Sequence, residues 1–332
     1  MECPICKSLK TVVLYKNLDK IYKVSHYAIH KSLCIEKCLS CGQVFTSPQL
    51  GYGELKNYFS GEYLSFGIKE RGKNLFQIIQ SFLKKKTLEQ FFGYDHRRWW
   101  GFLLYTFSIP LAHYPNNKMG KKILDIGCGS GNYLAEVEKI GWDVYGIDPS
   151  DVAVNVAKGR GLKNIYKGDA IKLPFEDNFF DVISIFHVFE HVPNPQEVLN
   201  ETKRVLKPGG ILIIGVPNFS SLGSKIYGKY WAGLSFPLHY FFYTQKTLGK
   251  VLTRSNFDVL SLNYSNLFSD IFTSSPESFL SPIFNYAMPA YIRKFLSLVD
   301  FITGNIDYIF GNIFAQTFHL GSQITIVSRN KK

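Results

Sequence analysis

The sequence predicts an α/β protein with a doubly wound, mostly parallel sheet of seven strands, preceded by a small cysteine-bearing module. From residue 119 onward, apolar strand-like runs alternate with helix-like runs, which is typical of a parallel sheet covered by helices on both faces. A glycine-rich stretch, DIGCGSG (125–131), follows the first of these runs, at the place where such sheets bind ligands. Two C-x-x-C pairs lie within the first 41 residues.

The composition fits a protein with a sizeable core. Of the 332 residues, 46% are hydrophobic, and no run of eighteen uncharged apolar residues occurs. With a polar N-terminus that does not resemble a secretory signal, we expect a cytoplasmic protein, soluble or peripheral at the inner membrane face. The net charge of +12 suits nucleic acid, anionic lipid or an anionic substrate, and can also reflect genome composition.

Three regions are expected along the chain. Residues 1–48 form a zinc-ribbon-like module, in which 22–30 alternates like a strand. Residues 49–118 are aromatic and basic and form a helical connector or cap. Residues 119–332 form the α/β domain, interrupted by a helical insert at 265–318.

The elements of the α/β domain follow from the apolar patterns and their end signals. Either Ser150 or Asp151 caps the second helix, Pro195 lies in the first turn of the third, and KPGG (207–210) makes a turn. The expected helices are 132–140, 150–160, 194–206 and 244–256. The expected strands are 121–126, 142–148, 163–169, 179–186, 211–217, 257–264 and 321–329.

The glycine loop excludes two common ligand classes. No Gly-Lys-Ser/Thr follows it, so it is not a P-loop, and Asn132 occupies the place of the third glycine of a dinucleotide fingerprint. The glycines here are Gly127, Gly129 and Gly131. Backbone N–H groups at the start of a helix suit a carboxylate, such as that on the methionine part of S-adenosylmethionine.

An acid closes each of the first three strands of the domain. Asp125 would hold the ammonium group of S-adenosylmethionine, directly or through water, and Asp148 would accept both ribose hydroxyls. Asp169 would meet the adenine amino group, with Ala170 beside the ring. Cys128 is expected to pack against the cofactor. Three acids at three successive strand ends predict the ligand more strongly than the glycine loop alone.

These stretches resemble the class I S-adenosylmethionine-dependent methyltransferases. The resemblance runs nearly without gaps over 121–264, through ILDIGCGSGNYL, VYGIDPS and the segment from GDAIKLPF to VPN. It implies a Rossmann-like methyltransferase fold in which the last strand runs antiparallel, inserted beside the sixth. It also implies a methyltransferase that uses S-adenosylmethionine.

The cysteine pairs predict a structural metal site. Paired C-x-x-C knuckles supply four thiolates, the ligand set of a closed tetrahedral zinc site. Its expected ligands are Cys3, Cys6, Cys38 and Cys41. Competing candidates in the same region are Cys34, His26 and His30.

The first 64 residues, together with the domain that follows, resemble a bacterial methyltransferase subfamily with an N-terminal zinc-binding module. Many of its members belong to surface-polysaccharide or secondary-metabolite pathways, which implies a small-molecule or saccharide acceptor, free or linked to a nucleotide or lipid. An RNA methyltransferase with a zinc module and a lipid or quinone O-methyltransferase remain alternatives. Nucleic acid is less expected as a partner because no RNA-binding motif is present.

The catalytic candidates are two histidines. His191 follows Glu190 after the fourth strand, and His239 lies in an aromatic segment, 218–243, which is expected to form a substrate lid. In quinone-ring O-methyltransferases of related sequence, a Glu and a following Glu-His pair hold a divalent metal. Here the first position is His187, which weakens the case for a metal, so none is assigned there. We expect His187 to line the methionine side of the pocket.

The insert at 265–318 is rich in phenylalanine and poor in charge, so it is not expected to be a solvated loop. Two interpretations are open: helices that cap the substrate, or a peripheral face against an anionic membrane. The membrane interpretation would use tryptophans and basic residues outside the insert, namely Lys84, Lys85, Lys86, Arg97, Arg98, Trp99 and Trp100.

Overall fold

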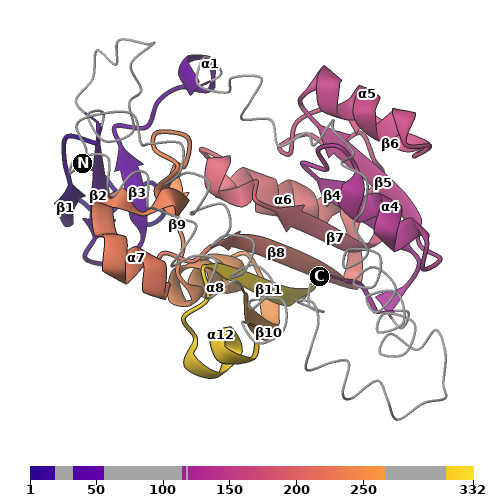
Figure 1. The fold of residues 1–332 in the computed structure, drawn as a ribbon. Coiled ribbons are helices and arrows are strands. Elements are labelled where there is room, and N and C mark those ends of the chain that lie inside the picture. Colours follow the sequence, from indigo (N-terminus) through magenta and orange to yellow (C-terminus); the bar gives the residue numbers. More distant parts are fainter. Residues whose placement is uncertain (19–32, 56–113, 117–118, 266–311) are drawn as a thin grey trace, which may run out of the picture.

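The computed structural model describes residues 1–18, 33–55, 114–116, 119–265 and 312–332. Two sheets organise this part of the chain, one of seven strands and one of four (Figure 1). The expected strand at 22–30 lies outside the described residues, as do most of the expected connector and most of the insert.

The large sheet has the order β10-β11-β8-β7-β4-β5-β6. Strands β4 to β8 pair in parallel, and β11 runs antiparallel between β8 and β10. This confirms the predicted fold, including the inserted antiparallel strand. The strands are β4 (Lys122–Ile126), β5 (Asp143–Asp148), β6 (Asn164–Lys167), β7 (Phe180–Phe186), β8 (Leu206–Pro217), β10 (Phe257–Ser265) and β11 (Gln323–Asn330).

Helices cover both faces of the large sheet because its strands are apolar on both sides. On one face, apolar side chains of α4 and α5 pack on a buried cluster that includes Ile123 and Val182. On the other, α6 and α8 pack on a cluster that includes Leu124 and Ile183. The helices are α1 (Tyr52–Leu55), α4 (Asn132–Glu138), α5 (Asp151–Gly159), α6 (Pro195–Val205), α7 (Leu222–Tyr227), α8 (Gln245–Arg254) and α12 (Asn312–Phe318).

Local signals define the helix starts. The Ser150 side chain accepts the backbone N–H of Ala153 at 3.4 Å, so serine rather than aspartate caps α5. Thr244 and Thr247 form a reciprocal capping box at the start of α8. Short 3₁₀ turns occupy Phe189–His191, Gly228–Tyr230 and Ala232–Leu234.

The KPGG segment differs from its prediction. It lies within β8, which begins at Leu206, instead of forming a turn between helix and strand. The pairing with β7 jumps from Phe180–Leu206 to Val182–Ile211, so the extra residues form a bulge. Asn330 holds the bulge, because its side-chain amide donates to the carbonyls of Leu206 and Lys207.

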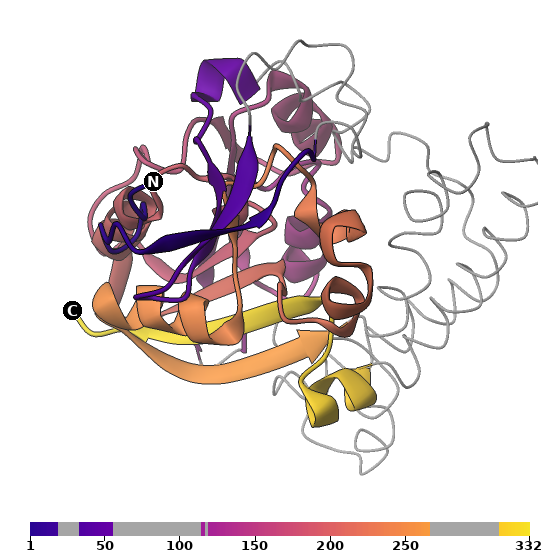
Figure 2. The ribbon, with the colours of Figure 1, turned by 90° about the vertical axis from the view of Figure 1, so that its left-hand side faces the viewer.

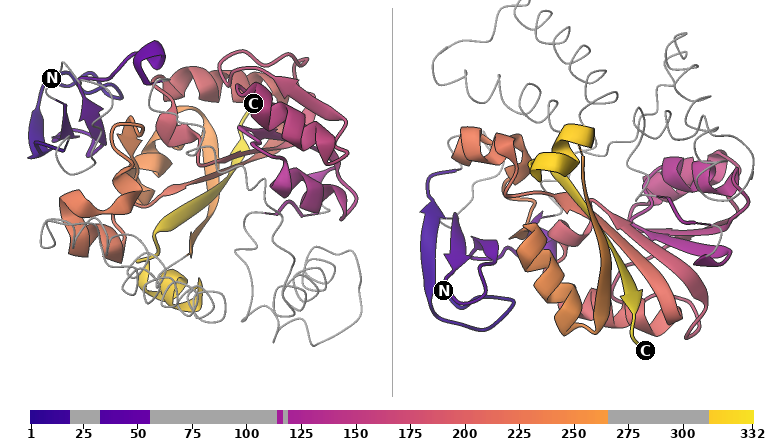
Figure 3. Two further views of the ribbon diagram at one scale, coloured as in Figure 1. Left: turned by 45° about the horizontal axis from the view of Figure 1, so that its top comes forward. Right: turned by 90° about the horizontal axis from the view of Figure 1, so that it is seen from below.

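The small sheet joins the N-terminal module to the large domain. Its antiparallel order is β1-β2-β3-β9, made of β1 (Thr11–Tyr15), β2 (Cys34–Cys38), β3 (Val44–Ser47) and β9 (Phe241–Phe242). Strand β9 comes from the lid segment and pairs with β3. Figures 2 and 3 show that β1 to β3 lie beside the large sheet and are not part of it. Residues of both regions share one hydrophobic core.

No helix within the described part of the chain combines the length and the apolar character needed to span a membrane.

Candidate functional site

The glycine loop connects β4 to α4 in a conformation that favours glycine. Gly127, Gly129 and Gly131 all have positive φ, between 52° and 74°. A Cβ atom on Gly127 would lie 2.2 Å from a methyl group of Val188. The backbone N–H groups of Gly127 and Cys128 both donate to the carbonyl of Ile147, which ties the loop to the end of β5.

Asp148 ends β5, and its carboxylate is oriented by two backbone groups. One oxygen accepts the N–H of Gly129 at 2.9 Å, and the other accepts the N–H of Ser150 at 2.9 Å. The side chain is buried, and burial raises its pKa, against the effect of these two hydrogen bonds. Asp148 therefore holds the glycine loop and the start of α5 in place, in addition to any contact with a ligand.

Asp125 lies in β4, beside the middle of β7. Its carboxylate accepts a 2.7 Å hydrogen bond from the Ser184 hydroxyl. Burial raises the pKa of Asp125 to about 7; the Ser184 hydrogen bond opposes this shift and nearby Asp148 adds to it. A cationic group at this position would favour the ionised form.

The remaining candidates at this edge have different surroundings. Asp169 follows β6, is exposed, and accepts the N–H of Ile171 at 3.2 Å. Ala170 is buried beside it. The Cys128 thiol is buried on the α4 side of the sheet, where it would be 2.7 Å from a Cβ on Gly146. Cys128 was expected to pack against the cofactor; in the structure its thiol packs against Gly146.

Glu190 is the centre of a second group of polar residues, after β7. It is 1% exposed, and neither carboxylate oxygen has a hydrogen-bond partner among the described residues. Its Oε1 lies 3.6 Å from His187 Nδ1 and 3.9 Å from His239 Nε2. The rings of His191 and His239 meet edge to face, 4.6 Å apart. A buried carboxylate is thus surrounded by three imidazoles.

Main-chain carbonyls define which nitrogens of two imidazoles carry a hydrogen. His191 Nδ1 lies 3.0 Å from the carbonyl of Leu238, and His239 Nδ1 lies 3.1 Å from that of Gly233. A carbonyl only accepts, so each Nδ1 carries the proton and each Nε2 has the lone pair in the neutral ring. His239 Nε2 therefore directs a lone pair toward the Glu190 carboxylate, an arrangement that a cation between them would stabilise.

The charges within this group are coupled. Burial would raise the pKa of Glu190, but His187 and the other two histidines lower it to about 2. Burial lowers the pKa of His239 to about 3, so this imidazole is neutral at physiological pH. The Glu190 carboxylate raises the pKa of His187.

Three of these groups could hold a metal ion. Glu190, His191 and His239 each offer one ligand atom, and these atoms lie within 4.8 Å of one another. A carboxylate with two imidazoles suits first-row divalent ions. The third group, His239, lies 48 residues from His191 in the chain, so its place beside Glu190 could not be predicted from sequence spacing.

His187 is turned toward β11. It has a φ of 54°, and its Nε2 lies 3.0 Å from the side-chain nitrogen of Gln323. Its half-exposed ring thus contacts both Glu190 and the start of β11.

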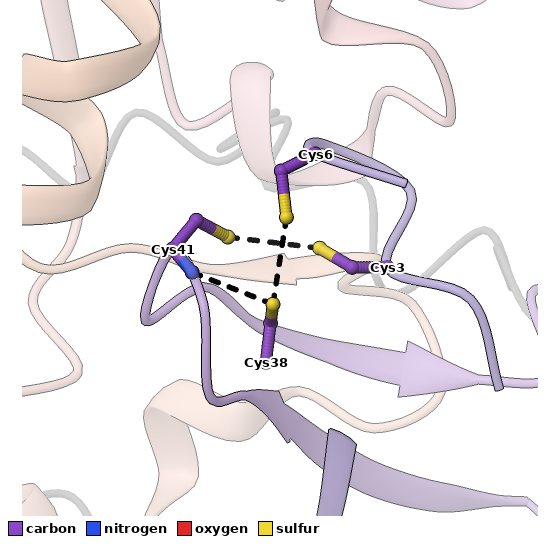
Figure 4. Close-up of side chains that lie close together, drawn as sticks. All are labelled: Cys3, Cys6, Cys38 and Cys41. Carbon is purple, nitrogen blue, oxygen red and sulfur yellow. Dashed lines mark hydrogen bonds between the residues drawn. The ribbon is translucent and has the colours of Figure 1, made fainter. Parts of the chain in front are cut away.

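The four cysteines of the two knuckles come together, as predicted. Figure 4 shows their sulfur atoms pointing toward one another. Cys3 and Cys41 sulfurs are 3.7 Å apart, those of Cys6 and Cys38 are 3.5 Å apart, and all four lie within 4.8 Å. Sulfurs placed about 2.3 Å from a tetrahedral zinc ion are about 3.8 Å apart, so the set fits that ion.

The surroundings of the cysteine cluster favour the thiolate form of Cys38. The backbone N–H of Cys41 donates to the Cys38 sulfur at 3.5 Å. Burial alone would raise the pKa of Cys38, but backbone N–H groups of Cys41 and Ser40 help lower it to about 6. Cys34 does not belong to the cluster and lies 3.7 Å from Glu36. His26 and His30 lie outside the described residues.

Two residues of the site were missed by sequence reasoning. Ser184 is the one polar residue in the run VISIF (182–186), and this departure was a signal that could have found it. Gln323 had no such signal, because its contact with His187 joins residues 136 positions apart.

The chain belongs to the methyltransferase domain family, whose profile matches residues 94–262, just over half of its length. Together with the seven-stranded topology, this makes the protein a methyltransferase enzyme of the S-adenosylmethionine-dependent class. The prediction of class and fold is therefore confirmed.

Two curated relatives match about a third of the chain. A demethylmenaquinone methyltransferase of Geobacillus stearothermophilus is 41% identical over 107 residues, covering 30% of this chain and 46% of the relative. A ubiquinone biosynthesis O-methyltransferase of Actinobacillus pleuropneumoniae is 38% identical over 114 residues, covering 31% and 48%. The chain thus spans about half the length of these relatives.

Solved structures of the same class are also similar. An S-adenosylmethionine-dependent methyltransferase of Methanosarcina mazei has a TM-score of 0.45 at 20% identity, covering 67% of this chain and 97% of that one. One from Archaeoglobus fulgidus has a TM-score of 0.42 at 21% identity, with coverage of 63% and 86%.

Binding of S-adenosylmethionine is expected to strengthen as pH rises from about 6 to about 8. The pKa of Asp125 is raised to about 7 in the folded protein, so ionising this side chain without a ligand costs folding stability. The stability of the ligand-free protein therefore falls as the pH rises above the pKa that Asp125 has in the unfolded chain. An ammonium group beside Asp125 needs that ionised form. Calorimetry across this pH range should therefore show affinity increasing and then levelling off.

The Asp125→Asn variant is the control for this pH dependence. It should bind weakly and without the same rise. Ser184→Ala removes the hydroxyl that favours ionised Asp125, so its affinity should level off at a higher pH. Identical pH profiles in wild type and Asp125→Asn would show that another group is responsible.

Proposed function

We propose that this enzyme transfers a methyl group from S-adenosylmethionine to a small-molecule or saccharide acceptor. The observation that carries the proposal is the order of polar groups along one sheet edge. Asp125, Asp148 and Asp169 lie at the ends of three adjacent strands, and the group around Glu190 follows the next strand, β7. A cofactor held by the three acids would direct its reactive end toward Glu190 and the histidines.

The cofactor contacts are assigned to groups with suitable chemistry. The N–H groups of the loop at Gly127, Gly129 and Gly131 would receive its carboxylate, and Asp125 its ammonium. Asp148 would accept the ribose hydroxyls and Asp169 the adenine amino group, with Ala170 beside the ring. When bound, S-adenosylmethionine supplies a methyl group on a positively charged sulfur.

The chain's own residues prepare the acceptor. His191 is half-buried with its lone pair on Nε2. It is proposed to take the acceptor proton as the acceptor–methyl bond forms and the methyl–sulfur bond breaks, which releases S-adenosylhomocysteine. The Glu190 carboxylate stabilises the resulting imidazolium. His239, neutral and buried, lies beside the carboxylate with its Nε2 3.9 Å from Oε1, and His187 is proposed to line the methionine side of the pocket.

The second proposed component is a structural zinc ion held by Cys3, Cys6, Cys38 and Cys41. The four convergent sulfurs and the N–H donated to Cys38 support it. A closed set of four thiolates leaves no open position for a substrate, so the ion would act on folding rather than on the acceptor.

A lipid or quinone acceptor is the second candidate. It is favoured by the relatives themselves, which are demethylmenaquinone, ubiquinone and sterol 24-C-methyltransferases by name. Contact with an anionic membrane would fit such an acceptor, although the residues proposed for it lie outside the described part. Sedimentation with anionic liposomes at low and high salt tests that contact, and a protein that stays in solution at both contradicts it.

The acceptor class can be assigned by measuring S-adenosylhomocysteine release with three probes: nucleotide-linked sugars, a hydroxylated quinol and structured RNA. We expect release with the sugars; release with the quinol alone would favour the second candidate. His191→Gln should lower the rate about 100-fold while leaving cofactor affinity unchanged. Failure of the wild type to bind S-adenosylmethionine at millimolar concentration would overturn the proposal.

A further inference from the structure

The segment 239–243, which carries His239, is held on one side by the N-terminal module. Thr46 of β3 donates its hydroxyl to the carbonyl of His239 at 2.7 Å, and its backbone N–H to the carbonyl of Tyr240 at 2.9 Å. The Gln43 side chain donates to the carbonyl of Phe242 at 3.0 Å. The Tyr240 hydroxyl in turn donates to the carbonyl of Leu50 at 2.7 Å.

The other side of the same segment contacts the Glu190 group. The backbone N–H of Tyr240 donates to the carbonyl of Glu190 at 2.9 Å, and the His239 ring is held by the carbonyl of Gly233. The peptide that joins His239 to Tyr240 therefore lies between Thr46 and Glu190. Any rotation of this peptide would change the 3.9 Å separation of His239 Nε2 from the Glu190 carboxylate.

We propose that Thr46 is a positioning residue for methyl transfer, and that the N-terminal module thereby forms part of the active site. This rests on the proposed function, in which His239 and Glu190 lie together beside the acceptor and their relative position matters. The physical reason is burial. Thr46 is 1% exposed and His239 4%, so water cannot replace the lost hydrogen bond, and an unpaired buried carbonyl would rotate toward another donor.

The test uses the full chain labelled with ¹⁵N-histidine. Thr46→Val keeps the shape of the side chain and removes only its donor. We expect the imidazole signals of His239 to move, while those of His319, which stacks on Tyr264 of the edge strand β10, stay in place. Thr46→Ser restores the hydroxyl and should restore the signals. Thr11→Val makes the same change on β1, where the hydroxyl bonds to Met1 and Glu36, and should move nothing at His239.

Two further measurements separate positioning from general stability. Calorimetry should give the same affinity for S-adenosylmethionine in wild type and Thr46→Val. The kcat with the probe that is methylated in the release assay should fall about 10-fold to about 100-fold. If the wild type did not bind S-adenosylmethionine, the proposed function would be wrong, but the histidine spectra would still test whether Thr46 positions His239. Unchanged His239 signals in folded Thr46→Val would overturn the inference. If Thr46→Val does not fold, Thr46→Ala gives the same comparison.

Discussion

Asp148→Ala is expected to weaken binding of S-adenosylmethionine about 10-fold to about 100-fold. A hydrogen bond to a charged group contributes roughly 1.5 to 3 kcal/mol, and this carboxylate is proposed to accept from the ribose. The effect should be increased by disorder of the glycine loop, because the same carboxylate accepts the N–H of Gly129. Isothermal titration calorimetry at neutral pH gives the affinity directly.

Asp151→Ala is the matched control for this prediction. Asp151 lies three residues further on, in the first turn of α5, and its exposed carboxylate forms an ion pair with Lys167. Exposed ion pairs contribute little, so cofactor affinity should change less than twofold. If Asp148→Ala bound the cofactor as tightly as the control, the ribose assignment would be wrong.

Cys38→Ser is expected to remove zinc from the protein and to unfold the β1-β2-β3 region. Wild type should contain one zinc ion per chain by elemental analysis, and the variant close to none. A serine hydroxyl stays protonated and is a poor zinc ligand, and structural zinc supplies folding free energy directly. Thermal unfolding should begin at a lower temperature, since both regions share one hydrophobic core.

Cys34→Ser makes the same chemical change in the same strand. Cys34 is the first residue of β2 and lies outside the cluster, so the Cys34→Ser variant should retain its full zinc content. Cofactor affinity should be largely intact in both variants, because the acids proposed to bind it lie in or just after β4, β5 and β6, at the opposite end of the large sheet from β1 to β3. Full zinc occupancy in Cys38→Ser would mean that another residue is the ligand.

The strand order of the large sheet could be predicted because its signals are local or come from the family resemblance. Apolar runs, Ser150 and Pro195 mark elements within a few residues of themselves. The KPGG segment was predicted wrongly because Gly209 and Gly210 are typical of turns. The bulge that they form instead depends on Asn330, which lies about 120 residues away.

Part of the candidate site could be predicted because an acidic residue recurs near the ends of successive strands. Asp125, Asp148 and Asp169 lie in or just after the last residues of three successive strands, and this repetition indicates one sheet edge. The role of Glu190 was not predictable, because it depends on His239, which approaches from a segment on the other side of β8 in the chain. Pairing of β3 with β9 was equally hidden, since a two-residue strand has no periodicity.

The position of β11 has a consequence for how the chain folds during synthesis. Strands β8 and β10 are consecutive strands of the large sheet along the chain, but β11 separates them in the sheet and begins 58 residues after β10 ends. Until residues 323–330 emerge, the apolar β8 keeps an unpaired edge toward solvent, and such edges recruit other chains. Slow translation before residue 323 should therefore favour aggregation, and a chaperone that covers strand edges should be needed most at that moment.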